Sequence, residues 1–218
     1  MNVSEKVVNF ALLASAACAL VVTGLLVQQR FEQKRQNEEL RPRHVSGWPE
    51  LQAGPLVTGD PNGTVTLVEF SDYQCPFCAR FALDVLPELK QKFGSQLKVV
   101  HRQWPLSNHP HAYAAARAAT CAASQQRFEQ IHAALFKRQT EIGKAAFVDF
   151  AKEAGVKDLE VFAKCAADTV PVASIDYDIR LAERIGALGT PTILVDGWMF
   201  FGVTAQQLDS AITAAIQK

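Results

Sequence analysis

The fold is decided by the stretch Val65-Thr66-Leu67-Val68-Glu69-Phe70-Ser71-Asp72-Tyr73-Gln74-Cys75-Pro76-Phe77-Cys78. Its first six residues are mainly β-branched or apolar, which predicts a buried central strand. A helical pattern, which we expect to kink at Pro87, begins at Pro76, so the two cysteines stand at a strand-to-helix junction. Their spacing lets both sulfurs meet across one turn, and the helix N-terminus favours a thiolate at Cys75. The stretch therefore predicts a dithiol/disulfide redox centre.

The chain on either side of this stretch predicts an α/β domain over residues 53–218. A second strand is predicted at 97–104, and a hairpin at 192–201 turns at Asp196-Gly197. Thr204 is placed to cap a last helix. Between these strands, about residues 107–186, apolar residues recur at helical spacing. We therefore expect a helical domain inserted into a small sheet.

The N-terminal part predicts a membrane attachment. Residues 1–6 form a short tail, and Val7 to Val27 carry no charge over a length of roughly 30 Å at ~1.5 Å per residue, enough for a bilayer core. We interpret 7–27 as a transmembrane signal-anchor; a signal peptide cleaved near Ser15-Ala16-Ala17, or lipidation at Cys18, are the alternatives. Residues 28–52 predict a charged tether, either a solvated stalk helix or a self-association segment.

Composition and cysteine count indicate the compartment. The 218 residues have zero net charge, which argues against a nucleic-acid partner. Cys18 lies in the predicted span, and an even number of cysteines remains outside it, as expected for two pairs in an oxidising space. By the positive-inside rule, the basic residues that flank the span would place most of the chain in the cytoplasm. The cysteine chemistry instead favours the extracytoplasmic, periplasmic side. We give the chemistry more weight.

Other uses of paired cysteines find little support. A zinc half-site would need a second C-x-x-C or an H-x₃₋₅-H pattern, and residue 79 is alanine where haem attachment would need histidine. His109, His111 and His132 have no cysteine or carboxylate at suitable spacing, so packing or helix-start roles are expected. The sequence predicts no metal and no organic cofactor.

Several motifs together resemble a known family. They are Val68-Glu69-Phe70-Ser71-Asp72-Tyr73-Gln74-Cys75-Pro76-Phe77-Cys78, Trp104-Pro105-Leu106 with His109, and Gly189-Thr190-Pro191-Thr192. In these motifs the chain resembles membrane-anchored DsbA-like thiol:disulfide oxidoreductases of the thioredoxin superfamily. The resemblance covers about residues 53–218 and implies a thioredoxin fold with an inserted all-helical domain; the one transmembrane helix expected before it rests on residues 7–27.

The resemblance also implies roles for individual residues. Cys75 would be the nucleophile and Cys78 the resolving thiol. Thr190-Pro191 would form a cis-proline loop that binds extended substrates, together with Pro76 and Phe77; an ordinary proline at a strand start is the alternative.

Two further features are less specific. Glu69 matches the family's buried acid, which would relay the proton of Cys78; the alternative is an outward-facing residue on an alternating strand. Cys121 and Cys165, each beside alanines in the helical block, are expected to form a structural disulfide, and the alternative is two buried free thiols.

The expected function is the introduction of disulfides into reduced exported polypeptides, with reoxidation by a membrane partner of the DsbB or VKOR type. Two alternatives stay open at this point. One is a reductase or isomerase of the same fold, and the other is a non-catalytic, membrane-anchored binding module. Intact Cys75 and Cys78 argue against the binding module.

Overall fold

The computed structural model describes residues 20–35, 38 and 41–217, in two compact units that divide after Arg41. In the first unit, residues 20–35 form a helix, and its large apolar side chains, from Leu20 to Phe31, are exposed. No helix in the described part of the chain is long and apolar enough to cross a membrane. Residues 7–19 of the expected span lie outside the described residues.

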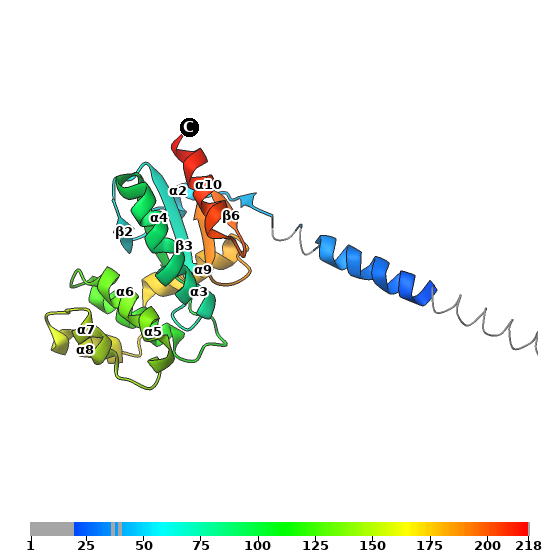
Figure 1. Cartoon of the computed structure of the whole chain (residues 1–218). Coiled ribbons are helices and arrows are strands. Elements are labelled where there is room, and N and C mark those ends of the chain that lie inside the picture. The colour runs from blue at the N-terminus through cyan, green and yellow to red at the C-terminus, as the bar shows by residue number, and fades with distance from the viewer. Residues whose placement is uncertain (1–19, 36–37, 39–40, 218) are drawn as a thin grey trace, which may run out of the picture. The chain divides into compact units, whose positions relative to one another are not determined.

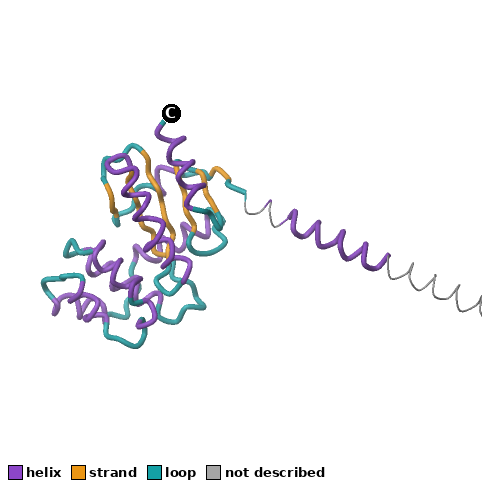
Figure 2. The backbone as a smooth tube through the Cα atoms, in the orientation of Figure 1, coloured by secondary structure: helices purple, strands orange, loops and turns teal. Residues whose placement is uncertain are grey.

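The second unit is built on a six-stranded sheet with the order β1-β6-β5-β3-β4-β2 (Figures 1 and 2). The strands are β1 (Arg43–His44), β2 (Val57–Gly59), β3 (Val65–Ser71), β4 (Leu97–Gln103), β5 (Thr192–Val195) and β6 (Trp198–Phe200). Only β3 and β4 pair in parallel; every other neighbouring pair is antiparallel. All seven residues of β3 are buried, as its apolar sequence predicts for the centre of a sheet.

Helices connect and cover these strands. The α-helices are α2 (Trp48–Leu51), α3 (Pro76–Arg80), α4 (Leu86–Phe93), α5 (Ala112–Ala123), α6 (Phe128–Lys137), α7 (Phe147–Glu153), α8 (Leu159–Ala167), α9 (Ala173–Arg184) and α10 (Ala205–Ile216). A π-helical segment, η1 (Phe81–Val85), and two 3₁₀ turns, η2 (Gly94–Gln96) and η3 (Gln139–Glu141), complete the elements. Thr204 begins α10 with a capping box that Gln207 completes.

Each face of the sheet has its own hydrophobic core. On one face, Leu67 and Val99 pack with apolar residues of α4 and α10, which lie together in front of the sheet in Figure 1. On the other face, Val68 and Phe70 pack against residues of α9 and α2. This alternation along β3 places odd-numbered residues, Glu69 included, on the α4 side.

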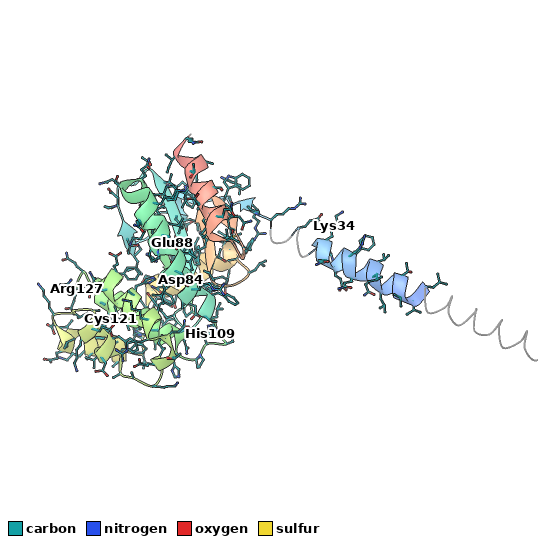
Figure 3. All side chains as sticks on the ribbon, in the orientation of Figure 1. Lys34, Asp84, Glu88, His109, Cys121 and Arg127 are labelled. Atoms are coloured by element: carbon teal, nitrogen blue, oxygen red, sulfur yellow. A yellow bond between two sulfur atoms is a disulfide. The ribbon has the colours of Figure 1, made fainter. Side chains whose placement is uncertain are left out.

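The helical block carries a third core. The block consists of α5 to α8, which follow β4 in the chain and form the lower lobe in Figure 1, whereas α9, the last helix of the expected insertion, packs on the sheet. Cys121 of α5 and Cys165 of α8 form a disulfide with a Cα–Cα distance of 5.9 Å, and Figure 3 labels Cys121 within this block. Both redox cysteines, with Tyr73, belong to the same cluster of buried residues as this block. The insertion therefore packs directly against the predicted redox site.

Two local features differ from the expectation. The tether is predicted to reach Gln52, but the folded unit begins at Pro42, because Arg43–His44 pairs with β6 and Leu51 is buried. The helix after Cys75 is predicted to kink at Pro87, and it instead contains the π-helical turn η1 just before that proline. A proline has no N–H for the helical ladder, and a π turn is one way to accommodate that loss.

Candidate redox site

The predicted redox pair lies where β3 ends and α3 begins. Cys75 is the N-cap residue with extended backbone angles, φ −79° and ψ 121°, and Pro76 occupies the first helical turn. A proline fits there because the first helical N–H groups have no partner within the helix. Cys75 thus stands where free backbone N–H groups and the helix dipole favour negative charge.

The Cys75 sulfur faces the loop that precedes β5. Its thiol donates a hydrogen bond to the carbonyl oxygen of Thr190, at 3.2 Å, and the Thr190–Pro191 peptide bond is cis. The pKa of Cys75 is lowered from 9.0 to about 5, chiefly by a hydrogen bond from the Cys78 thiol. Burial acts in the opposite direction and raises this pKa, while hydrogen bonding with Thr190 and with the backbone N–H groups of Cys78 and Phe77 lowers it further. Cys75 is therefore a thiolate at neutral pH.

Cys78 has the opposite electrostatic environment. Cys78 is fully buried, and its sulfur accepts a hydrogen bond from the backbone N–H of Asp72 at 3.5 Å. Burial raises the pKa of Cys78 far above 9.0, and the neighbouring charges of Cys75 and Glu69 raise it further. Of the two sulfurs, the first is thus held ionised and the second protonated, as expected of an attacking and a resolving thiol.

Asp72 organises the loop before the cysteines. Its carboxylate accepts hydrogen bonds from the backbone N–H of Gln74 at 2.6 Å and of Leu106 at 2.7 Å. The same carboxylate lies 2.9 Å from Nδ1 of His109, which Figure 3 labels near the start of α5. The sequence predicts only a packing or helix-start role for His109, and the fold gives it a carboxylate partner 37 residues away.

Gln139, which the sequence did not single out, joins the helical insertion to this loop. Its Nε2 amide donates to the carbonyl oxygens of Tyr73 and Cys75, both at 2.9 Å. A side chain that donates to two carbonyl oxygens two residues apart fixes the backbone conformation around Cys75. No local pattern marks this glutamine, because its partners lie more than 60 residues earlier.

Glu69 is fully buried, so the outward-facing alternative is wrong. It lies opposite His101 in the parallel pairing of β3 with β4, and its Oε2 is 3.1 Å from His101 Nδ1. His101 Nε2 in turn lies 2.9 Å from the hydroxyl of Thr58. Burial raises the pKa of Glu69 and lowers that of His101 to about 3, so the imidazole is neutral. Proton relay by Glu69 stays a prediction.

His132 of α6 approaches the same carboxylate from the helical block. Its Nδ1 lies 3.0 Å from the Tyr73 hydroxyl, and its ring centroid is 4.6 Å from that of His101. One donor atom from each of Glu69, His101 and His132 lies within 4.8 Å of the others. The helical periodicity places His132 on an apolar face, but only the assembled fold brings it to Glu69.

The residues predicted to bind substrate surround the reactive sulfur. Pro76 and Phe77 are exposed, with 64% of Phe77 accessible, while Thr190 and Pro191 are partly buried. Leu188, two residues before Thr190, is also 64% exposed. Phe77 and Leu188 are exposed large apolar side chains in segments that meet at the Cys75–Thr190 hydrogen bond.

The described fold agrees with a family model. The model for thioredoxin matches residues 52–216. The chain belongs to this thioredoxin family. Among solved structures, a thioredoxin-like oxidoreductase from Silicibacter pomeroyi is 31% identical, with a TM-score of 0.63 over 75% of this chain and 92% of that one. BdbD from Bacillus subtilis, in its oxidised form, superposes with a TM-score of 0.70 over 80% of this chain and 97% of that one.

BdbD is only 21% identical to this thioredoxin-family chain, so the similarity supports the fold and nothing beyond it. The Silicibacter pomeroyi protein, described as a thioredoxin-like oxidoreductase, has the same fold. Curated relatives include the Na(+)/H(+) antiporter NhaA 1 of Mycobacterium sp. strain KMS, 34% identical over 145 residues, which are 65% of this chain and 23% of that protein. A second is NhaA 1 of Salinispora arenicola, 33% identical over 161 residues. The chain spans about a quarter of the length of these relatives.

Proposed function

We propose that this chain is a thiol:disulfide oxidoreductase that introduces disulfides into reduced exported polypeptides. The observation that carries the proposal is the contrast between the two sulfurs: Cys75 is the N-cap of α3 beside the Thr190 carbonyl, whereas Cys78 is fully buried. Cys75 has a pKa of about 5, and the buried Cys78 has a raised pKa. A stabilised thiolate makes the reduced form favourable, and a dithiol with a stable reduced form is an oxidant when it carries a disulfide.

The reaction consists of two exchanges. A substrate thiolate attacks Cys75 Sγ, the Cys75–Cys78 bond breaks, and Cys78 leaves with the electron pair and takes up a proton. A second substrate thiolate then attacks the substrate sulfur of the mixed disulfide. Cys75 departs as a thiolate, and the substrate has lost two electrons to the Cys75–Cys78 pair. The low pKa of Cys75 favours its departure, because a thiol of lower pKa leaves faster.

The substrate binds beside the cis-proline loop in this proposal. The Thr190 carbonyl lies next to the Cys75 sulfur and offers an acceptor to the backbone of an extended peptide. The exposed Phe77 and Leu188 supply apolar surface for side chains of an unfolded polypeptide. These contacts are largely independent of substrate sequence, as a general folding oxidant requires.

The direction of electron flow is decided by one experiment. The purified chain, oxidised at Cys75–Cys78, is mixed with a reduced, unfolded protein whose activity requires disulfides, and its potential is measured against glutathione. If the chain is an oxidase, the substrate protein regains its activity, and the redox potential of the Cys75–Cys78 pair lies well above that of thioredoxin, ~−270 mV. A potential at or below the thioredoxin value, with reduction of substrate disulfides, would assign a reductase instead.

We further propose that residues 7–27 anchor the chain in the cytoplasmic membrane, with the folded unit on the periplasmic side. The uncharged run from Val7 and the exposed apolar side chains of 20–31 support this. A membrane partner of the DsbB or VKOR type would reoxidise Cys75 and Cys78. Alkaline washing of membranes should leave the chain in the pellet, and protease added to spheroplasts should digest its folded unit. Release by alkali would contradict the anchor.

A further inference from the structure

Below the redox pair, three buried side chains converge, and the 3.1 Å contact between Glu69 Oε2 and His101 Nδ1 leaves two of their polar atoms unpaired within the described part of the chain. Glu69, His101 and His132 come from β3, β4 and α6, and their exposed fractions are 0%, 2% and 7%. Glu69 Oε1 and His132 Nε2 are buried and have no hydrogen-bond partner among the described residues. Buried polar atoms are nearly always paired, so two such atoms in one cluster indicate an occupant that binds both.

In both histidines, one ring nitrogen lies within hydrogen-bond distance of a hydroxyl group. Thr58 Oγ1 lies 2.9 Å from Nε2 of His101, and the Tyr73 hydroxyl lies 3.0 Å from Nδ1 of His132. If each ring donates its proton to that hydroxyl, His101 Nδ1 and His132 Nε2 keep their lone pairs, and a cation would take the place of the 3.1 Å contact between His101 Nδ1 and Glu69 Oε2. Histidines that bind metals are oriented in this way, by a hydrogen bond from the second ring nitrogen.

We infer that Glu69, His101 and His132 form a buried binding site for a divalent transition-metal cation of the zinc type. Two neutral imidazoles and a carboxylate are a zinc ligand set with a fourth position left open. The three donor atoms lie within 4.8 Å of one another, and Zn–N and Zn–O bonds of ~2.0–2.2 Å require them to draw closer around the ion. The cation would compensate the buried carboxylate charge, which no lysine or arginine reaches by a salt bridge among the described residues.

The position of the site gives it a structural consequence. Glu69 and His101 belong to the sheet, whereas His132 belongs to the helical insertion. A bound cation would therefore tie the two halves of the folded unit together directly beneath Cys78. A carboxylate bound to a cation also cannot take up a proton, so metal occupancy and proton relay by Glu69 would exclude each other. The site is closed to solvent, so loading requires folding around the ion or local opening.

The test uses the full chain in detergent with Cys18, Cys75 and Cys78 replaced by serine, so that no free thiol can bind metal and no redox activity is involved. The protein is refolded with Co²⁺ or Zn²⁺, freed of loose metal, and analysed for metal content and for the visible absorption of Co²⁺. We expect one ion per chain with nitrogen and oxygen ligands. A failure of the redox proposal would leave this result unchanged.

Matched variants locate the ion. Glu69→Gln and His132→Leu should abolish binding, and His44→Gln, at an exposed histidine, should leave it unchanged. Tyr73→Phe and Thr58→Val keep the ligands and remove their hydroxyl partners, so each should weaken affinity about 10–100-fold. These two variants decide the matter if Glu69→Gln or His132→Leu does not fold. Metal uptake no greater than that of Glu69→Gln, as expected if the cluster holds only a water molecule, or full affinity in Tyr73→Phe, would overturn the inference.

Discussion

The sulfur of Cys75 lies 3.2 Å from the carbonyl oxygen of Thr190, although 115 residues separate them in the chain. The thiol donates a hydrogen bond to that oxygen, and the thiolate cannot. Deprotonation therefore frees the carbonyl as an acceptor at the moment when the sulfur becomes reactive. The protonation state of Cys75 is thus linked to whether the Thr190 carbonyl is available to bind a peptide.

Alkylation of reduced protein should report the thiolate directly. With a Cys75 pKa of about 5, the rate of reaction with iodoacetamide should rise through a midpoint near pH 5 and stay level to pH 8. In Cys78→Ala the midpoint should move upward, because the hydrogen bond from the Cys78 thiol is the largest cause of the lowered pKa of Cys75. A wild-type midpoint near 9 would contradict the assignment of Cys75 as the attacking thiolate.

The same shift predicts how stability depends on pH. The folded pKa of Cys75 lies below its ordinary value of 9.0, so ionised Cys75 stabilises the reduced protein above pH 5 and increasingly up to pH 9. This contribution is lost as the pH falls through 5. The free energy of unfolding of the reduced wild type, minus that of Cys75→Ser, should therefore grow from pH 5 to pH 8 in urea titrations. A difference that is flat over this range would exclude the linkage.

Phe77→His should lower the pKa of Cys75 further. Position 77 is exposed and lies in the N-terminal turn of α3, so a protonated imidazole there would add a positive charge near the thiolate. The alkylation midpoint should move below that of the wild type, and the exchange potential should rise. Phe77→Leu, which changes the shape without adding charge, serves as the control. An unchanged midpoint in Phe77→His would show that the side chain points its charge away from the sulfur.

Gln139→Leu should destabilise the protein and disturb the redox loop. It removes both partly buried hydrogen bonds to the carbonyls of Tyr73 and Cys75, and one such bond typically contributes about 0.5–1.5 kcal/mol. We expect a loss of about 1–3 kcal/mol in the free energy of unfolding of the oxidised protein, together with slower exchange with substrate. Gln206→Leu, at an exposed site on α10, should change neither quantity measurably. Equal effects of both substitutions would refute the positioning role.

Removing the second disulfide should cost stability without touching the redox centre. Cys121 and Cys165 close a loop with a sequence separation of 44 residues, for which chain entropy predicts a contribution of about 4 kcal/mol. The double variant Cys121→Ala, Cys165→Ala should unfold at a correspondingly lower urea concentration, with the alkylation midpoint of Cys75 unchanged. A shift in that midpoint would show that the disulfide also shapes the thiolate environment.

Much of this fold follows from local sequence. Val65 to Phe70 read as a central strand and form β3, the Asp196-Gly197 turn lies between β5 and β6, and Thr204 caps α10. These features depend on burial over short segments, on a turn that tolerates positive φ, and on a cap that acts within one helical turn. Each is visible in the sequence because its cause lies within a few residues.

The remaining features depend on contacts that span the chain. Arg43–His44 carries no strand pattern and becomes a strand only because β6 offers it an edge. Gln139 and His132 gain their partners when α6 and η3 pack against the loop after β3. Glu69 and His101 face each other through the register of β3 with β4, which no periodicity within either strand reveals. The sequence therefore identified the reacting sulfurs more fully than the residues that hold them.

Asp72 has a dynamic consequence beyond its part in the site. Its single carboxylate receives the amide of Gln74 in the redox loop and that of Leu106, after β4. Because one side chain holds both amides, rotation of the Asp72 carboxylate releases them together, and we expect the two loops to open in one cooperative event. In native-state hydrogen exchange, Gln74 and Leu106 would then share a single opening free energy, and fluctuations of the redox loop would be felt on the neighbouring loop at the same rate.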